Sequence, residues 1–363
     1  MKKILFETHH LYYLPNFLPI IESLRLRGDY EIFVSMPQYM QERERNLFYN
    51  AANDIGLELI KTEFEEDRIE KIKSKDFDVM IVGNVGQLTK IVSESTIAVM
   101  VYHGIGLKQS YYNDIDSRID IRAVESKSRY KTLTVQGHQN LALTGYTKLD
   151  PLFTTSEQEK LVTKKILGID NNLPILLYAP TFYPTSFDNL ASELEYLSSE
   201  FNIIIKLHNF SWFQQRFIYQ SKLAQEIESR SDNVYLLDNS IYNIVPYYLI
   251  ADALISDISS TIFEFLPLNR PIVQAECLHL RLRHRILKKR FMKKLDIQRM
   301  QELEFVYKVE SPSELFRSVS FACDHPDEMS DLRLEAHDYF LYKRDGNASE
   351  RLIDEIEKNL QLK

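Results

Sequence analysis

Short apolar runs alternate with longer segments of helical periodicity along most of this chain of 363 residues. Runs such as "KILFE" at 3–7 and "PILLYAP" at 174–180 are typical of strands that are buried on both faces. Amphipathic stretches such as "LPNFLPIIESLRLRG" at 14–28 separate these runs. A chain that repeats strand and helix in this way is expected to form parallel sheets covered by helices, an α/β fold.

The expected strands fall into two groups, which fit two Rossmann-like domains. We place the first domain at 1–150 and the second at 151–345, because Asp150-Pro151 interrupts the local pattern. Thr155 or Ser156 can cap the helix that follows. Residues 346–363 are expected to form a C-terminal helix, with Asn347 or Ser349 as its cap. The expected strands are 3–7, 30–36, 57–60, 78–83, 96–102 and 132–135, then 174–180, 202–208, 233–237, 252–256, 271–275 and 305–309.

Composition limits the class of protein. Hydrophobic residues make up 44% of the chain, enough for a substantial core, and the formal net charge of -8 argues against a nucleic-acid partner. The cysteines Cys277 and Cys323 suggest core residues of a reduced compartment rather than a disulfide framework. No apolar run is long enough for a signal peptide or a membrane span. We expect a cytoplasmic protein that associates at most peripherally with the inner face of the cell membrane.

Polar side chains gather where the expected strands end, which is the edge of a parallel sheet that binds ligands. In the first domain His103 follows a strand, and Gly104 after it lets the backbone approach a ligand closely. In the second domain Thr181 follows one strand, while Lys206 and His208 share a face at the end of another. A basic pair suits phosphate, and a histidine can accept a proton from an attacking hydroxyl or stabilise phosphate oxygens. The alternative for either histidine is a structural hydrogen bond.

The stretch "ALISDISSTIFEF" at 253–265 places three hydroxyls, Ser259, Ser260 and Thr261, between a strand and a helix. Capping needs one hydroxyl, and a helix N-terminus favours anions, so we interpret the run as a phosphate cradle. Simple capping is the alternative. Asp257 would repel a phosphate if it faced one, so we expect it to orient or cap the loop. Glu264 can accept hydrogen bonds from a ribose, or it can lie on a solvated helix face.

Several familiar cofactor patterns are missing from the sequence. Neither GxGxxG nor GxxxxGK[ST] occurs, which argues against a standard dinucleotide or P-loop site. No Cys/His cluster suggests zinc, and no cluster of carboxylates demands another metal. We therefore expect an activity that needs neither a cofactor nor a metal ion.

Several segments, in this order, together resemble the CDP-glycerol glycerophosphotransferase family, which includes teichoic acid polymerases and primases. They are "YHGIGLK", "LTGYTKLD", "LLYAPTF", "IIIKLH", "DALISDISSTIFEF", "RPIV" and "DGNASERL", spread over residues 102–352. The resemblance implies a GT-B architecture, in which two Rossmann-like domains face a cleft. It also implies transfer of a polyol phosphate, most simply glycerol phosphate, from a CDP-activated donor.

The resemblance assigns roles to particular positions. The family's two motif histidines fall on His103 and His208, with catalytic roles, and its hydroxyl run, which contacts the donor phosphates, falls on 259–261. An acceptor hydroxyl, on a glycan, a polyol phosphate or a lipid-linked molecule, would attack the phosphorus, and CMP would leave. The chain departs from the family at Thr147-Lys148 and at "KLHNF", which bears on donor and acceptor identity. The alternatives are a GT-B glycosyltransferase that uses a nucleotide sugar, and a non-catalytic scaffold of envelope assembly.

The segment "RLRHRILKKRFMKK", Arg281–Lys294, holds four arginines, four lysines and no acid. Three interpretations remain open. The segment is a solvated helix face, it directs arginines at the donor phosphates, or it binds an anionic membrane or a phosphate-bearing acceptor. The lysines whose replacement would test the membrane interpretation are Lys288, Lys289, Lys293 and Lys294.

Overall fold

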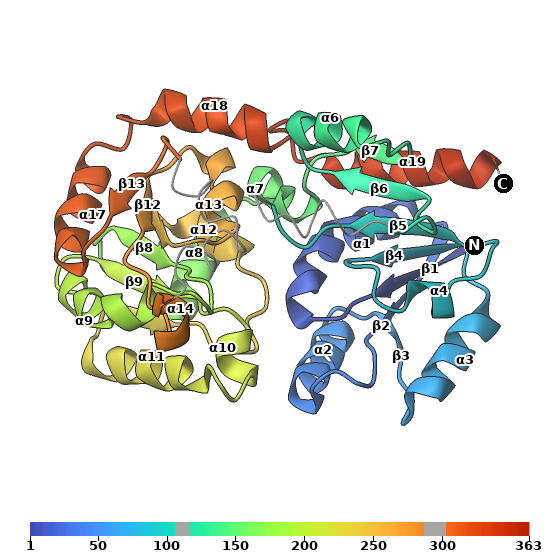
Figure 1. Cartoon of the computed structure of the whole chain (residues 1–363), viewed down its shortest axis with the longest axis horizontal. Helices are drawn as coiled ribbons and strands as arrows, with labels where there is room; N and C mark the ends of the chain where they lie inside the picture. Colours follow the sequence, from blue (N-terminus) through green and yellow to red (C-terminus); the bar gives the residue numbers. More distant parts are fainter. Residues whose placement is uncertain (106–115, 287–302, 363) are drawn as a thin grey trace. The chain divides into compact units, whose positions relative to one another are not determined.

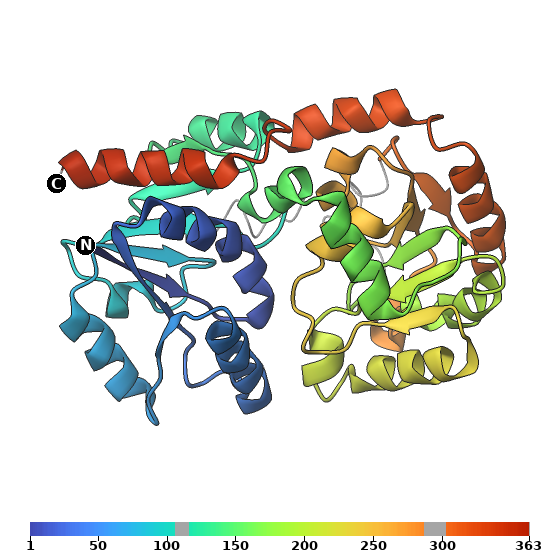
Figure 2. The same ribbon diagram turned by 180° about the vertical axis from the view of Figure 1, so that it is seen from behind.

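The structure is a computed structural model that describes residues 1–105, 116–286 and 303–362. The chain forms two compact units (Figures 1 and 2). Unit 1 holds the described residues of Met1–Ile105, Ser110–Phe153 and Asp338–Lys363, and unit 2 those of Thr154–His337. The C-terminal residues 346–363, which the sequence analysis set apart, thus lie within unit 1. None of the helices described here has the length and apolar character required to cross a bilayer.

Unit 1 is built on a parallel sheet with the strand order β3-β2-β1-β4-β5-β6-β7. Its strands are β1 (Lys2–Glu7), β2 (Tyr30–Ser35), β3 (Glu58–Ile60), β4 (Val79–Val82), β5 (Ile97–Val101), β6 (Ile121–Val124) and β7 (Leu141–Leu143). Its helices are η1 (Leu11–Tyr13), α1 (Leu14–Arg27), α2 (Glu42–Asp54), α3 (Glu65–Lys75), α4 (Leu88–Ile91), α6 (Lys127–Val135), η2 (Thr147–Leu149) and α19 (Ala348–Leu362). The strand order reverses between β1 and β4, so the ligand-binding edge of this sheet is expected at their carboxyl ends.

Unit 2 is built on a second parallel sheet with the strand order β10-β9-β8-β11-β12-β13. Its strands are β8 (Ile175–Tyr178), β9 (Asn202–Ile205), β10 (Val234–Leu236), β11 (Ala253–Ser256), β12 (Ile272–Ala275) and β13 (Tyr307–Val309). Its helices are α8 (Glu157–Leu167), α9 (Phe187–Leu197), α10 (Phe210–Phe213), α11 (Ile218–Arg230), α12 (Val245–Ile250), α13 (Thr261–Glu264), η3 (Leu266–Leu268), α14 (Leu282–Ile286), η4 (Pro312–Glu314) and α17 (Leu315–Asp324). Two further helices, α7 (Pro151–Thr154) and α18 (Ser330–Phe340), cross the unit boundaries. Here the order reverses between β8 and β11.

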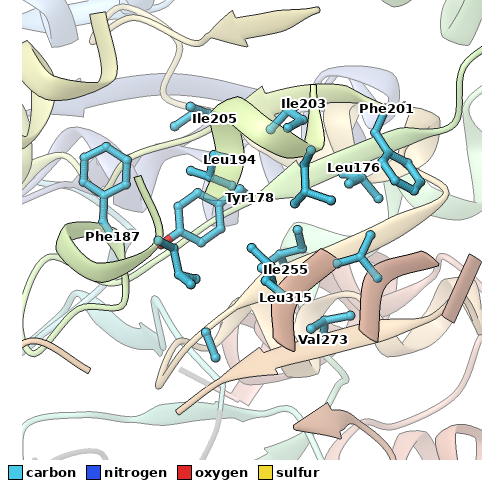
Figure 3. Packing of buried hydrophobic residues seen from close by; sticks show 14 of the residues in the cluster. Leu176, Tyr178, Phe187, Leu194, Phe201, Ile203, Ile205, Ile255, Val273 and Leu315 are labelled. Carbon is cyan, nitrogen blue, oxygen red and sulfur yellow. The ribbon is translucent and has the colours of Figure 1, made fainter. Parts of the chain in front are cut away.

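The core of unit 2 lies between its sheet and the helices on one face. Figure 3 shows Tyr178 and Ile255 from adjacent strands packed with Phe187 and Leu194 of α9 and with Leu315 of α17. These side chains are fully buried. Burial of apolar surface stabilises the fold by about 25 cal/mol per Å². This packing holds the strands in place, and with them the starts of the loops that follow.

One expected strand is wrong. Residues 132–135, "TLTV", belong to helix α6, because Ser126 caps that helix by accepting a hydrogen bond from the backbone N–H of Arg129. Val135 at its end is 81% exposed, so its β-branched side chain takes no part in a sheet.

Strands β6 and β7 were not expected from the sequence. In β6 the apolar pattern is interrupted by Arg122, which is nevertheless buried and donates to the hydroxyl of Tyr102.

The first turn of α19 is capped from a distant part of the chain. Asp150 accepts hydrogen bonds from the backbone N–H groups of Ala348, at 2.9 Å, and Ser349, at 2.8 Å. The cap therefore comes from Asp150 rather than from the side chains of Asn347 or Ser349, the two residues expected from the sequence. By contrast Ser156 does cap α8, as one of the two residues expected there, in a capping box with Glu159.

Replacing Asp150 with alanine should destabilise unit 1 by about 1–3 kcal/mol, because two buried N–H groups at a helix N-terminus lose their acceptor. Asp150→Asn keeps one acceptor oxygen and should lose less. Denaturant unfolding of both variants measures the difference, with Asp54→Ala, at an exposed position near the end of α2, as the control. Equal stability of the Asp150→Ala variant and the wild type would contradict the capping role.

Candidate functional site

The candidate site in unit 1 lies at the carboxyl ends of β1, β4 and β5. His103 follows β5 and is partly exposed, and Gly104 beside it is buried. The His103 Nδ1 lies 3.1 Å from the carbonyl oxygen of Gly83, the residue directly after β4. A carbonyl oxygen only accepts hydrogen bonds, so Nδ1 carries the proton and donates it. In the neutral ring the lone pair is then on Nε2, which makes Nε2 the atom that can accept a proton.

Two more histidines follow β1 in the same unit. His9 is buried, and within the part of the chain that the structure describes neither of its ring nitrogens has a hydrogen-bond partner. Burial, helped by the nearby positive charges of His10 and Arg68 and opposed by Glu65, lowers the pKa of His9 to about 4. His10 instead turns to the buried carboxylate of Glu44, with its Nδ1 3.3 Å from Oε1. The adjacent histidines thus have different surroundings, as expected for neighbouring positions that face apart.

The buried neutral state of His9 predicts sensitivity of the fold to acid. The folded pKa of about 4 lies below the ordinary value of 6.5, so the unfolded chain takes up a proton first as the pH falls. The stabilisation that neutral His9 contributes is therefore present above about pH 6.5, and it is lost as the pH falls from 6.5 to 4. At pH 5 the loss from this group should be about 2 kcal/mol.

Denaturant unfolding of the wild type and of His9→Leu at pH 7.5 and pH 5 measures this effect. The variant should lose about 2 kcal/mol less than the wild type over that interval. His325→Leu, at an exposed position in unit 2, serves as the control and should follow the wild type. If His9→Leu and the wild type lose the same free energy, His9 is not the acid-sensitive group.

In unit 2 the side chain of Asp257 joins the loops that follow β8 and β11. Its Oδ1 accepts from the backbone N–H of Thr181 at 2.8 Å, and its Oδ2 accepts from the backbone N–H and the hydroxyl of Ser186 at 3.0 and 3.1 Å. The residue is fully buried, and burial raises the pKa of Asp257 to about 7, against the lowering effect of these hydrogen bonds. The carboxylate therefore faces the interior of the loops and does not present a charge at the surface.

The three hydroxyls after Asp257 have different surroundings. The Oγ1 of Thr261 lies 2.8 Å from the Oγ of Ser256, which itself donates to the carbonyl of Ala179 at 2.7 Å. Ser259 accepts a long hydrogen bond of 3.4 Å from the backbone N–H of Thr261. Ser260 stands at the N-cap position of α13 and makes no side-chain capping bond. Thr261 thus joins β8 to β11, while Ser259 and Ser260 are partly exposed at the sheet edge.

His208 lies after β9, next to β8 in the sheet. Its Nδ1 accepts a hydrogen bond from the backbone N–H of Phe210 at 3.1 Å, so the proton of the neutral ring is on Nε2. The rings of Phe182 and Phe210 lie 4.8 and 4.9 Å from its own ring. His208 is thus arranged as a hydrogen-bond donor at Nε2, the reverse of His103.

Two other candidate side chains of unit 2 are buried. Lys206 donates from Nζ to the carbonyl of Leu207 at 3.2 Å. Glu264 accepts from the hydroxyl of Tyr248 at 2.8 Å and is only 3% exposed, which excludes a solvated helix face for it.

The basic segment begins on an aromatic platform. The guanidinium of Arg281 lies over the rings of Tyr183 and Phe217, at 4.4 and 5.0 Å. The ring of Phe217 in turn lies 5.1 Å from that of Phe182, which contacts His208. The four lysines named above lie outside the described residues.

Sequence reasoning singled out His103 as a candidate but did not point to the groups that contact its ring. Gly83 and Tyr13 contact its ring, and Asn84 donates to the hydroxyl of Tyr13 at 3.3 Å. The stretch "IVGN" could have pointed to Gly83, because a glycine directly after an apolar strand often marks a close approach of another group to the backbone.

Comparison with known proteins places these residues in a wider context. The model of the family described as CDP-glycerol:poly(glycerophosphate) glycerophosphotransferase matches residues 92–358, well over half of the chain. The match includes both His103 and His208 and the hydroxyl run 259–261.

Two curated relatives are similar in sequence. The teichoic acid poly(glycerol phosphate) polymerase of Bacillus spizizenii is 31% identical over 142 residues, which cover 36% of this chain and 33% of the polymerase. The teichoic acid glycerol-phosphate primase of Bacillus subtilis is 26% identical over 223 residues, which cover 54% of each chain. The matched region thus spans about a third and about half of these relatives.

A solved structure supports the fold. The wall teichoic acid polymerase TagF matches with a TM-score of 0.71 at 18% identity, over 99% of this chain and 89% of that one. Together with the two parallel sheets, this likeness confirms the expected GT-B class of fold.

Proposed function

This chain belongs to the CDP-glycerol:poly(glycerophosphate) glycerophosphotransferase family, and on that premise we propose that it transfers glycerol phosphate, or another polyol phosphate, from a CDP-activated donor. The acceptor is a hydroxyl of a glycan, a polyol phosphate or a lipid-linked molecule, and the reaction serves teichoic acid or capsule-like polymer synthesis. The observation that carries this proposal is the family match, because it spans most of the chain and its range contains the positions of His103 and His208.

The proposed reaction forms one P–O bond and breaks another. The acceptor oxygen attacks the phosphorus that bears the polyol, and the bond from that phosphorus to the oxygen of CMP breaks. His103 accepts the acceptor's proton at Nε2, and His208 donates from Nε2 to a phosphate oxygen as charge grows on it. The tautomers inferred from Gly83 and from the backbone of Phe210 support this division of roles.

The other candidate residues have supporting roles in this proposal. Ser259 and Ser260 contact the donor phosphates, while Thr261 and Asp257 hold the loops that carry them. Lys206, Gly104 and Thr181 remain donor-binding candidates, and Glu264 the candidate for the ribose.

Incubation of the purified chain with CDP-glycerol and a short glycerol phosphate oligomer tests the function. Chromatography should detect CMP, and phosphorus NMR should detect a new phosphodiester, and both should form at least about 100-fold more slowly with His103→Ala. Release of a nucleoside diphosphate from a nucleotide sugar, with formation of a glycoside, would instead favour a glycosyltransferase. A chain that binds none of CDP, CMP, UDP and GDP in thermal-shift measurements would favour a scaffold.

Replacing both Ser259 and Ser260 with alanine should weaken CDP binding. Each hydrogen bond to a charged phosphate contributes about 1.5–3 kcal/mol, so the dissociation constant should rise at least tenfold. Calorimetry measures this change, and Ser229→Ala, on the exposed surface of α11, is the control. An unchanged dissociation constant in a folded variant would show that the two hydroxyls do not bind the phosphates and have only a local structural role.

The segment Arg281–Lys294 is proposed to contact an anionic surface, either a membrane or a phosphate-bearing acceptor. Its first residue, Arg281, is fixed on aromatic rings, which supports an ordered start for the segment. Sedimentation with anionic vesicles at low and high salt tests this, with glutamine in place of the four lysines as the comparison. Failure of the wild type to bind vesicles at low salt would exclude the membrane.

A further inference from the structure

The ring of His103 is held on one face by Tyr13. The two ring centroids are 4.2 Å apart, and the ring planes are 17° from parallel, so the rings are stacked. Tyr13 is only 3% exposed, and its hydroxyl accepts a hydrogen bond from Asn84 at 3.3 Å. Tyr13 is therefore fixed both by burial and at its outer edge. A stack of this kind restricts rotation of the imidazole out of its plane.

Gly83 contributes twice to the same arrangement. Its carbonyl oxygen accepts from Nδ1 of His103, which fixes the tautomer. A Cβ atom at Gly83 would lie 2.5 Å from Cδ2 of Tyr13 and 3.0 Å from Cε2, closer than carbon atoms approach without displacement. Gly83 is not among the glycines with positive φ, so the position requires glycine to make room for the tyrosine ring rather than for an unusual backbone conformation.

We infer that Tyr13 and Gly83 are positioning residues that aim Nε2 of His103. The carbonyl of Gly83 sets which nitrogen carries the proton, and the ring of Tyr13 sets the plane of the imidazole. The two residues follow β1 and β4, the strands between which the sheet order reverses, and His103 follows the next strand, β5. The inference rests on the proposed function only for the role of His103 as base. The hydrogen bond and the stacked rings are features of the chain itself, whatever reaction it catalyses.

The first measurement needs no substrate. Nitrogen-15 NMR of the imidazole of His103 in the whole chain should show the tautomer with the proton on Nδ1. Gly83→Ala should displace the ring of Tyr13 and give a mixture of tautomers. In Tyr13→Leu the Gly83 carbonyl alone should determine the tautomer. The imidazole of His103, no longer stacked, should then give broader nitrogen-15 signals. Identical His103 signals in the wild type and both variants would overturn the inference, whatever reaction the protein catalyses.

The second measurement is kinetic. A misplaced base costs about 100-fold in rate, so kcat should fall by about that factor in Tyr13→Leu and in Gly83→Ala, with KM changed less than about threefold. Tyr13→Phe keeps the stacked ring and should recover most of the rate. The double variant Gly83→Ala, Tyr13→Leu removes the clash, so it should regain thermal stability without regaining kcat.

A matched control separates positioning from stability. Tyr49→Leu makes the same chemical change at another buried tyrosine of unit 1, and it should lower the melting temperature without changing kcat or the His103 signals. If Tyr13→Leu behaves like Tyr49→Leu, the tyrosine is a packing residue only. If the wild type shows the Nδ1–H tautomer but no transfer from CDP-glycerol, the proposed function fails while the positioning geometry stands.

Discussion

Transfer is expected to fall by about 100- to 10,000-fold when His103 is replaced with alanine, the usual range for loss of a general base. Affinity for CDP should stay nearly unchanged, because the hydroxyl run proposed to hold the donor phosphates belongs to unit 2 and His103 to unit 1. Steady-state kinetics give the first quantity and calorimetry with CDP the second.

A matched histidine keeps this experiment interpretable. His138 also lies in unit 1 and is not among the candidate site residues. His138→Ala should keep kcat within about twofold, and both variants should show cooperative melting. Near wild-type turnover in a folded His103→Ala variant would show that another group accepts the proton.

The second large effect is a contrast between two replacements of His208. Loss of a preorganised donor to a developing charge costs about 100- to 1,000-fold, so His208→Ala should lose that much in kcat. Glutamine can place an amide N–H near the former position of Nε2, so His208→Gln should recover a substantial part of the rate. The reason is the hydrogen bond from the backbone N–H of Phe210 to Nδ1, which puts the proton of the neutral ring on Nε2.

The same replacement at His103 should give no recovery, because an amide nitrogen cannot accept a proton at neutral pH. Measurement of kcat for alanine and glutamine at both positions forms a four-variant comparison. If glutamine recovers activity at His103, the base is wrongly assigned. If glutamine is as poor as alanine at His208, His208 does not act as a neutral donor.

Much of the fold follows from local sequence pattern. Apolar runs such as "ILLY" in β8 can be buried on both faces only in a sheet covered by helices, and most of the segments expected to be strands contain a strand of the structure. The pattern failed at α6, where Ser126 starts a helix through threonines and a valine that favour strands. It failed again at β6, where Arg122 is buried because Tyr102 lies beside it.

The sequence by itself also determined which kinds of side chain follow the strands, because the succession of strand, loop and helix depends mainly on residues that are close together along the chain. His103, His208 and the hydroxyl run stood out for that reason. Only the tertiary structure decided the hydrogen-bond partners and the surroundings of each one. The proton sits on Nδ1 of His103 because folding brings the carbonyl of Gly83, at the end of β4, beside it. The pKa of Asp257 is raised because folding buries its carboxylate among the loops that follow β8 and β11.

The cap of α19 shows the same division. The sequence marked a helix at the C-terminus, but its cap, Asp150, is separated from Ala348 by most of unit 2 along the chain. Propensities describe a residue and its near neighbours, whereas a buried hydrogen bond needs a partner of the right chemistry within about 3 Å, whatever its place in the sequence. Folding supplies those partners, and with them the protonation states on which the proposed chemistry depends.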